Sequence, residues 1–415
     1  MAWTAAANAA IAVCGLLSGT LLARMLGAEG RGELAAIQAW PLVLATAGNF
    51  GLTEAAAYFA ATAPGRARTT LSSALLLSLP FSAAAVAAGL WILPHVLATQ
   101  TAAVQDAARI SLLLAPLLTL VAAPHQALRG AGHYKAWNVL RLMTPAGWVV
   151  ALLALGGAGQ AGPVNAALAF ILVTAISAGV GHLYAWRMLH GSAAPARQLV
   201  RPMLSYGAPT AVSALPQWLN LRLDQLVMIA LLAPESLGLY AVAVAWGGAA
   251  QPVATVLAYL AVPALANADD GRRKAHVVYR SGAIVSACAS VLLFVVTPVI
   301  LPTLFGAEFR AAVPAALILV IAGAVAGMNA VGGECLRGLG RPRGVLLAEV
   351  AGFVVTCIAV PVLIPIAGIV GAATASLVSY LAILLVQRRL ITTAGRVAGA
   401  AAEPNLVLAV EAPPR

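Results

Sequence analysis

The chain is organised as long runs of apolar residues separated by short polar segments. A helix that crosses the hydrocarbon core of a bilayer needs about 20 mostly apolar residues. Twelve runs approach or exceed this length, at residues 4–24, 34–56, 69–93, 105–128, 138–157, 164–187, 203–232, 239–264, 278–301, 312–334, 345–364 and 368–387. Lipid offers no hydrogen bonds to the backbone, so such runs fold as helices. The pattern predicts an all-α, polytopic membrane protein with about 12 transmembrane helices.

Two of the polar segments are versions of one another. Residues 27–40 (GAEGRGELAAIQAW) and 233–246 (APESLGLYAVAVAW) lie 206 residues apart and agree at Glu29/Glu235, Gly32/Gly238, Ala35/Ala241, Ala39/Ala245 and Trp40/Trp246. The same offset relates 162–171 to 368–377, and an offset of 208 relates ALRGAG at 127–132 to CLRGLG at 335–340. The offset spans six predicted helices, and an even number preserves orientation. The chain is therefore expected to form two parallel six-helix lobes.

The repeat also sets the expected domain limits. The first lobe covers residues 1–190 and the second covers 202–390, with a cytoplasmic linker at 191–201. The segment 391–415 bears Ala, Pro and Glu, and we expect it to be a disordered cytoplasmic tail.

Composition supports a membrane protein. Charged residues make up 9% of the chain, against about 25% in a soluble domain, and the mean hydropathy is +0.94. The net charge of +11 would suggest nucleic acid in a soluble protein. Here it is better explained by Lys and Arg in cytoplasmic loops, so no nucleic-acid partner is expected.

Basic residues also predict the orientation. With a cytoplasmic N-terminus, 19 of the 24 Lys and Arg residues fall on the inner side, Arg222 falls within a span, and four fall outside, namely Arg24, Arg31, Arg109 and Arg310. Both termini are expected in the cytoplasm of a multi-pass protein of the bacterial plasma membrane. The first hairpin does not follow this positive-inside pattern, because it carries Arg24 and Arg31 on the outer side. A natural start further upstream would account for this.

Metal and redox chemistry have no sequence support. The four cysteines form no C-x-x-C pair, and the six histidines show no metal-ligand spacing. No cofactor is expected, although a coupling ion, H⁺ or Na⁺, is compatible with a transporter.

Polar residues inside the predicted spans are candidate substrate contacts. An ionisable group at mid-bilayer costs roughly 2.5–3.5 kcal/mol on insertion scales. The run 203–232 contains Gln217, Asn220, Arg222 and Asp224. Residues two apart on a helix point about 200° from each other, so Arg222 and Asp224 are expected to have separate partners. They contact either substrate in a cavity or a neighbouring helix.

Four further charges are candidates outside that span. Arg24 ends the first span, and it either faces a cavity or snorkels to the outer head groups. Glu54 lies near the inner end of the second span. Glu54 and Asp224 are both candidates for ion coupling. Arg129 and Arg337, in the paired R-G-x-G loops, are expected to contact a substrate phosphate or anionic lipid at the cytoplasmic side.

Three segments carry a family resemblance. LLARMLGAEGRGELAAIQAW (21–40) resembles the first hairpin of polysaccharide flippases in the multidrug/oligosaccharidyl-lipid/polysaccharide (MOP) exporter superfamily. LRLDQLVMIALLAPESLGLYAVA (221–243) looks like the segment that opens that family's second half, and GIVGAATASLVSY (368–380) is similar to its last span.

The resemblance implies a fold and a function. The fold is that of the multidrug and toxin extrusion (MATE) type, with two lobes around a cationic cavity matched here by Arg24, Arg222 and Asp224. The function is that of an O-antigen (Wzx-type) flippase, which moves oligosaccharide on undecaprenyl diphosphate to the outer leaflet by alternating access. Expected partners are that lipid-linked oligosaccharide, membrane lipid, and a polysaccharide polymerase or glycosyltransferases of the same pathway.

Other functions remain open. A drug or cation antiporter of the same superfamily would use Asp224 or Glu54 to exchange ions, and a lipid II flippase usually has two more helices. A major-facilitator sugar transporter usually has an acid between spans two and three, which TAPGRARTT (62–70) lacks. A membrane glycosyltransferase would need paired outer carboxylates, so an enzyme is not expected.

Overall fold

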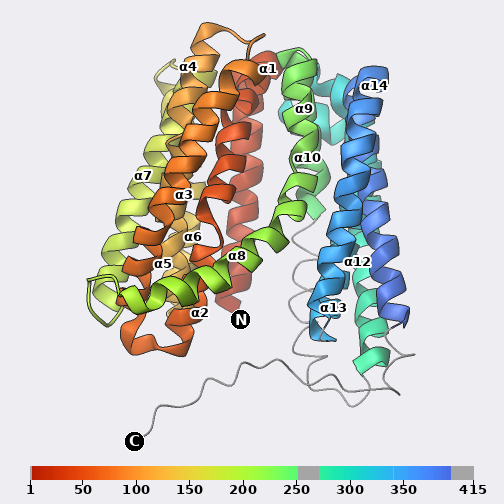
Figure 1. The fold of residues 1–415 in the computed structure, drawn as a ribbon. Helices are drawn as coiled ribbons and strands as arrows, with labels where there is room; N and C mark the ends of the chain where they lie inside the picture. Colours follow the sequence, from red (N-terminus) through yellow and green to blue (C-terminus); the bar gives the residue numbers. More distant parts are fainter. Residues whose placement is uncertain (1, 251–270, 340, 394–415) are drawn as a thin grey trace, which may run out of the picture.

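The structure is a computed structural model that describes residues 2–250, 271–339 and 341–393. Throughout these ranges the regular elements are helical (Figure 1), as predicted. The α-helices are α1 (Ala2–Asn49), α2 (Leu52–Thr62), α3 (Ala67–Val96), α4 (Ala102–Ser111), α5 (Leu114–Gly130), α6 (Tyr134–Gly157), α7 (Pro163–Met188), α8 (Arg197–Asn220), α9 (Leu223–Leu231), α10 (Pro234–Gly247), α12 (Gly271–Phe305), α13 (Val313–Gly338) and α14 (Pro342–Thr393). Short 3₁₀ turns lie at Pro64–Arg66, Gly248–Ala250 and Ala307–Ala312.

Eight stretches of the described chain are long and apolar enough to cross a membrane. Two of these stretches, in α1 and α14, each contain two predicted spans. Residues 251–264 of the predicted span 239–264 and residues 394–415 of the predicted tail lie outside the described residues.

The chain reverses direction inside α1 and α14. In α1 the reversal is at Gly27, whose φ of 68° is a conformation that glycine adopts without a Cβ penalty. In α14 it is at Ala367 and Gly368, where Gly368 has a φ of 53°. Across this second turn Gly352 packs against Ile383, and the hydroxyl oxygens of Thr356 and Ser379 are hydrogen-bonded at 2.7 Å. The two halves of α14 are therefore antiparallel.

Three predicted spans contain breaks that the hydropathy pattern does not show. The second span ends at Asn49 and resumes as α2, because Phe50 and Gly51 have φ values of 47° and 68°. The seventh is broken between α8 and α9 at Leu221 and Arg222.

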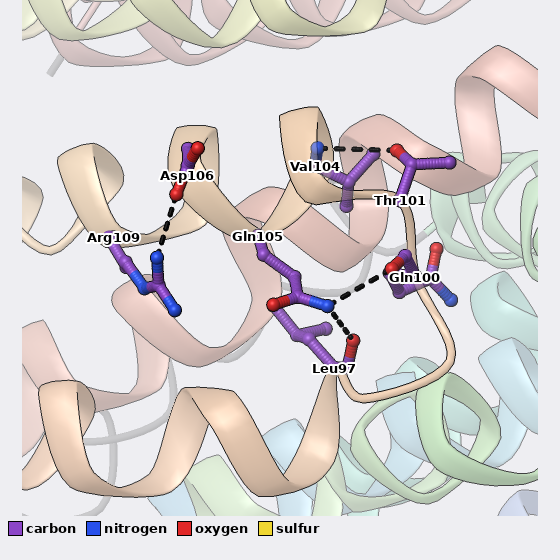
Figure 2. Close-up of polar contacts among 7 residues, drawn as sticks. All are labelled: Leu97, Gln100, Thr101, Val104, Gln105, Asp106 and Arg109. Atoms are coloured by element: carbon purple, nitrogen blue, oxygen red, sulfur yellow. Dashed lines mark hydrogen bonds and ion pairs between the residues drawn. The ribbon is translucent and has the colours of Figure 1, made fainter.

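The fourth span is divided into α4 and α5, and α4 has a polar start (Figure 2). Oγ1 of Thr101 accepts a backbone N–H at 3.4 Å, and Nε2 of Gln105 donates to the carbonyls of Leu97 at 3.1 Å and Gln100 at 3.0 Å. These contacts satisfy groups that the preceding turn and the helix start leave free.

The helices form two groups, with α8 running obliquely between them (Figure 1). The helices α3 to α7 lie at the left of the view, and α12 to α14 lie at the right. The first half of α8 packs on α2, where Met203 shares a buried cluster with Leu52 and Ala55. Its last residue, Asn220, hydrogen-bonds to α14. The predicted lobe boundary at 202 stays a prediction.

The apolar core is shared at one end of the molecule and divided at the other. Near residues 27–40 and 233–246, a single buried cluster combines Leu34 and Ile37 of α1 with Tyr240 of α10 and Phe305 of α12. We call this the hairpin end. At the opposite end, separate clusters serve the two groups, one built from α2, α3, α5, α6 and α7 and the other from α13 and α14. The two groups are thus joined mainly at the hairpin end.

Candidate functional site

The duplicated hairpins pack directly against each other. A Cβ added at Gly32 would overlap the carbonyl oxygen of Pro234 and lie 3.0 Å from N of Gly238. A Cβ added at Gly238 would overlap the carbonyl oxygen of Ala28 and lie 2.9 Å from N of Gly32. Residues 28 and 234, like 32 and 238, are repeat equivalents, so the contact is reciprocal. Only glycine allows the two backbones to approach this closely.

Arg24 connects the two groups of helices at the same end. Its Nη2 donates to the carbonyl of Thr303 at 2.7 Å, and its Nε donates to the carbonyl of Leu304 at 2.8 Å. These carbonyls belong to the last turn of α12. Carbonyls in the last turn of a helix receive no hydrogen bond from a following helical N–H. In this structure Arg24 therefore ties the helix groups together. Its expected contact with substrate stays a prediction.

We expect Arg24→Gln to loosen the hairpin end. Hydrogen bonds to a charged group contribute about 1.5–3 kcal/mol, so the population with separated lobes should rise about tenfold. Spin labels at Ala158 and Arg310, in a variant without the native cysteines, would report the separation as a distance distribution. Arg109→Gln is the control, because Arg109 bonds to Asp106 within its own helix at 2.7 Å. An unchanged distribution in Arg24→Gln would contradict the tie.

Arg222 lies within electrostatic range of a second arginine, Arg31 of α1. It lies at the break between α8 and α9, where its Nη1 donates to Oε1 of Gln225 at 3.2 Å. Arg31, in α1, lies close enough for the two positive charges to repel each other. The Nε of Arg31 is buried without a hydrogen-bond partner, and within the described residues no carboxylate pairs with either arginine. The pair is suited to bind an anion.

Arg31 was not among the predicted site residues, because it looks like part of an outer loop. Its repeat equivalent, 206 residues on, is Leu237. This difference between the two copies, a charged residue in one and a leucine in the other, is the sequence signal that could have identified Arg31 as a site residue.

Asp224 is held by hydroxyl and amide donors. Tyr240 donates its hydroxyl to Oδ2, Ser376 donates to the same oxygen at 3.2 Å, and N of Gln225 donates to Oδ1 at 2.7 Å. Only 5% of Asp224 is exposed. It does not pair with Arg222. A buried carboxylate without a cation is able to take a proton or a small cation.

Asn220 and Gln217 have different surroundings. Asn220 joins α8 to α14, since its Nδ2 donates to the backbone carbonyl of Glu349 at 3.1 Å and its Oδ1 accepts from Thr356 at 3.0 Å. Gln217 is exposed and faces a cavity of about 260 Å³ between α8, α13 and α14.

The remaining candidates lie apart from the arginine pair. Glu54 accepts from Asn49 at 3.2 Å and from Thr53 at 3.0 Å near the start of α2. Arg129, at the end of α5, lies 5.9 Å from the ring centre of Trp137. Arg337, at the end of α13, pairs with the carboxylate one turn before it and lines the cavity. Their predicted contacts with an ion or phosphate stay predictions.

Solved structures define the class of fold. An inward-facing multidrug resistance MATE family transporter of the MOP superfamily matches with a TM-score of 0.70 and 14% identity, over 95% of this chain and 99% of that one. The lipid II flippase MurJ in an inward closed conformation matches with a TM-score of 0.79 and 12% identity, over 95% and 88%. An outward-facing MATE transporter, at 14% identity over 95% and 97%, gives 0.62. The chain is a multi-pass membrane protein with the MATE fold.

The family follows from the sequence itself. Residues 1–269 match the profile of the family described as polysaccharide biosynthesis protein, and the chain belongs to that family. No curated protein sequence matches the chain. The predicted resemblance to the MOP superfamily and the predicted two-lobed fold are confirmed.

Proposed function

We propose that the protein is a flippase for oligosaccharide linked to undecaprenyl diphosphate. It moves this lipid from the cytoplasmic to the outer leaflet of the bacterial plasma membrane, with both termini in the cytoplasm. The observation that carries the proposal is that Arg31 and Arg222, one from each predicted lobe, lie close enough for their charges to interact and have no carboxylate partner in the described part of the chain.

The chemistry of the lipid fits this pair. A diphosphate is doubly anionic and does not cross hydrocarbon unaided, whereas its polyprenyl tail remains in the lipid. A guanidinium binds phosphate oxygens through a rigid fork of donors, which an ammonium does not offer. Two arginines from different lobes hold the diphosphate only while the lobes are close together. Relative movement of the lobes therefore changes the affinity, as alternating access requires.

The shape of the structure supports loading from the cytoplasmic side. The two groups of helices share a core at the hairpin end, which the distribution of basic residues predicts to face outside. At the other end the groups have separate cores, and α8 packs on α2 between them. The better match to the inward-facing than to the outward-facing MATE transporter, 0.70 against 0.62, agrees with this state.

Asp224 supports ion coupling better than it supports the transport of an organic cation. Its carboxylate is enclosed by Tyr240, Ser376 and the backbone of Gln225, with 5% exposure. A carboxylate with so little exposure can bind a proton or Na⁺ but cannot contact a drug-sized cation. The antiporter alternative thus lacks a cation site of adequate size at this carboxylate.

Arg31→Gln and Arg222→Gln are expected to test the proposal. Each change removes a charge-assisted contact to the diphosphate, so the initial rate of flipping should fall about tenfold or more. The measurement is the flipping of undecaprenyl-diphosphate-linked oligosaccharide in proteoliposomes. Lysine at either position should retain part of the rate, because the charge remains but the fork is lost.

Arg109→Gln is the matched control, since it removes an exposed arginine at the hairpin end. Wild-type rates in both test variants, or an equal loss in the control, would count against the proposal. In cells, depletion should trap carrier-linked glycan on the cytoplasmic leaflet. Normal export of every surface glycan from a clean deletion strain would refute the function itself.

A further inference from the structure

We propose that the cavity between α8, α13 and α14 binds the sugar ring nearest the carrier, a specificity subsite that rests on the proposed flippase function. The argument concerns the place of the cavity, its size, its chemistry and the unsatisfied polar groups in its wall.

The cavity lies beside the candidate diphosphate site. Gln217 and Leu221 form part of its wall, and Arg222 follows directly in the chain. In a lipid-linked oligosaccharide the first sugar is bonded to the diphosphate itself. A diphosphate held by Arg222 therefore brings that sugar next to this wall.

The volume suits a single ring. Sites for drug-sized ligands begin at about 300 Å³, and this cavity holds about 260 Å³. Small residues on one face of α13 provide the space, since Ala326, Gly327, Ala330 and Gly333 all line it. The rest of the oligosaccharide has to remain outside.

The lining matches a polyhydroxylated ligand. It combines the side-chain amides of Gln217, Asn329 and Gln387 with the carboxylates of Glu334 and Glu349. Amides both donate and accept, and carboxylates accept, so together they can satisfy hydroxyl groups in either sense. Two carboxylates stand against the single guanidinium of Arg337, which disfavours a second phosphate here.

Two of these amides contain polar atoms without partners. Gln387 is fully buried, and among the described residues neither its Oε1 nor its Nε2 has a hydrogen-bond partner. Asn329 is 8% exposed, and its Oδ1 is also unsatisfied, although its Nδ2 donates to the carbonyl of Tyr380 at 2.9 Å. A buried polar group left unsatisfied costs about 1–3 kcal/mol. Hydroxyl groups of a bound sugar would recover this cost when these side chains turn toward the cavity that they line.

The test compares two lipids on the whole protein in nanodiscs. The first is undecaprenyl diphosphate without a sugar. The second is the same carrier bearing one sugar, tested in turn with glucose, galactose and N-acetylglucosamine. At least one sugar-bearing lipid should bind the wild type about tenfold more tightly than the bare carrier, because a site built to hydrogen-bond hydroxyls rejects a ligand that lacks them.

Gln387→Leu should remove this preference while the affinity for the bare carrier stays unchanged. Ala330→Leu, which fills the cavity from an exposed position, should do the same if Gln387→Leu does not fold. Gln126→Leu is the matched control, since its Oε1 is likewise buried and unsatisfied but lies on α5, away from the cavity.

The outcomes separate this subsite from the function on which it rests. Equal binding of both lipids by the wild type, or an intact sugar preference in Gln387→Leu and Ala330→Leu, overturns the subsite alone. Loss of a Na⁺ dependence in Gln387→Leu with the sugar preference intact also overturns it, because the cavity is then a cation site. Failure of the wild type to bind either lipid overturns the proposed function together with the subsite.

Discussion

Replacing Gly32 or Gly238 even by alanine is expected to abolish flipping while the protein still reaches the membrane. The new Cβ would overlap the backbone carbonyl of Pro234 or of Ala28, and a backbone cannot move aside as a side-chain end can. Overpacking of this kind costs about 1–3 kcal/mol. At the upper end that cost corresponds to about a hundredfold shift from the state with a closed hairpin end to one in which it is open.

Flipping in proteoliposomes and the distance between spin labels at Ala158 and Arg310 would measure this effect. Gly15→Ala, in the same helix, is the control, because a Cβ added there meets no atom within 4 Å. The double change Gly32→Ala/Gly238→Ala should be little worse than either single change, since the first already opens the shared contact. A closed and active Gly32→Ala protein would disprove the role of this contact.

Replacing Asp224 by asparagine is expected to remove the ion dependence of flipping and to lower its rate about a hundredfold, because a neutral amide no longer changes charge when an ion arrives. The change preserves the size of the side chain, so the environment formed by Tyr240 and Ser376 stays largely intact. Rates in proteoliposomes under an imposed H⁺ or Na⁺ gradient would show which ion drives the wild type and whether the variant ignores it.

Glu54→Gln provides the matched carboxylate-to-amide control. Glu54 already accepts hydrogen bonds from Asn49 and Thr53, which makes it a local support of the break before α2. We expect it to change the rate about twofold at most, the cost of a modest hydrogen bond. Ion dependence that survives in Asp224→Asn but disappears in Glu54→Gln would reverse the assignment of the two carboxylates.

The fold could be predicted from the sequence because lipid leaves few alternatives for a long apolar run. The breaks could not, because their causes are contacts between distant segments. Gly51 adopts a positive φ where α2 meets α8, and a Cβ there would overlap the carbonyl of Gly207. Hydropathy records how apolar a residue is, and both sides of this break are equally apolar.

The candidate site was predicted only in part. The spacing of Arg222 and Asp224 indicated that they point apart, and each has its own partners in the structure. The identity of those partners depends on tertiary packing, which brings Tyr240 and Ser376 to one carboxylate. Arg31 was missed for the same reason, because only the folding of α1 brings it within electrostatic range of Arg222.

The reciprocal glycine contact bears on how such a chain could arise. A patch that meets its own copy across a two-fold axis is the interface of a symmetric homodimer. A half-length ancestor that dimerised in parallel would already have had this interface, with one glycine of each subunit against the backbone of the other. Symmetry would also have doubled any charge near the axis, placing two like arginines together. Fusion of the two genes allowed Arg31 in one half to coexist with Leu237 in the other, so that an asymmetric site became available at a symmetric joint.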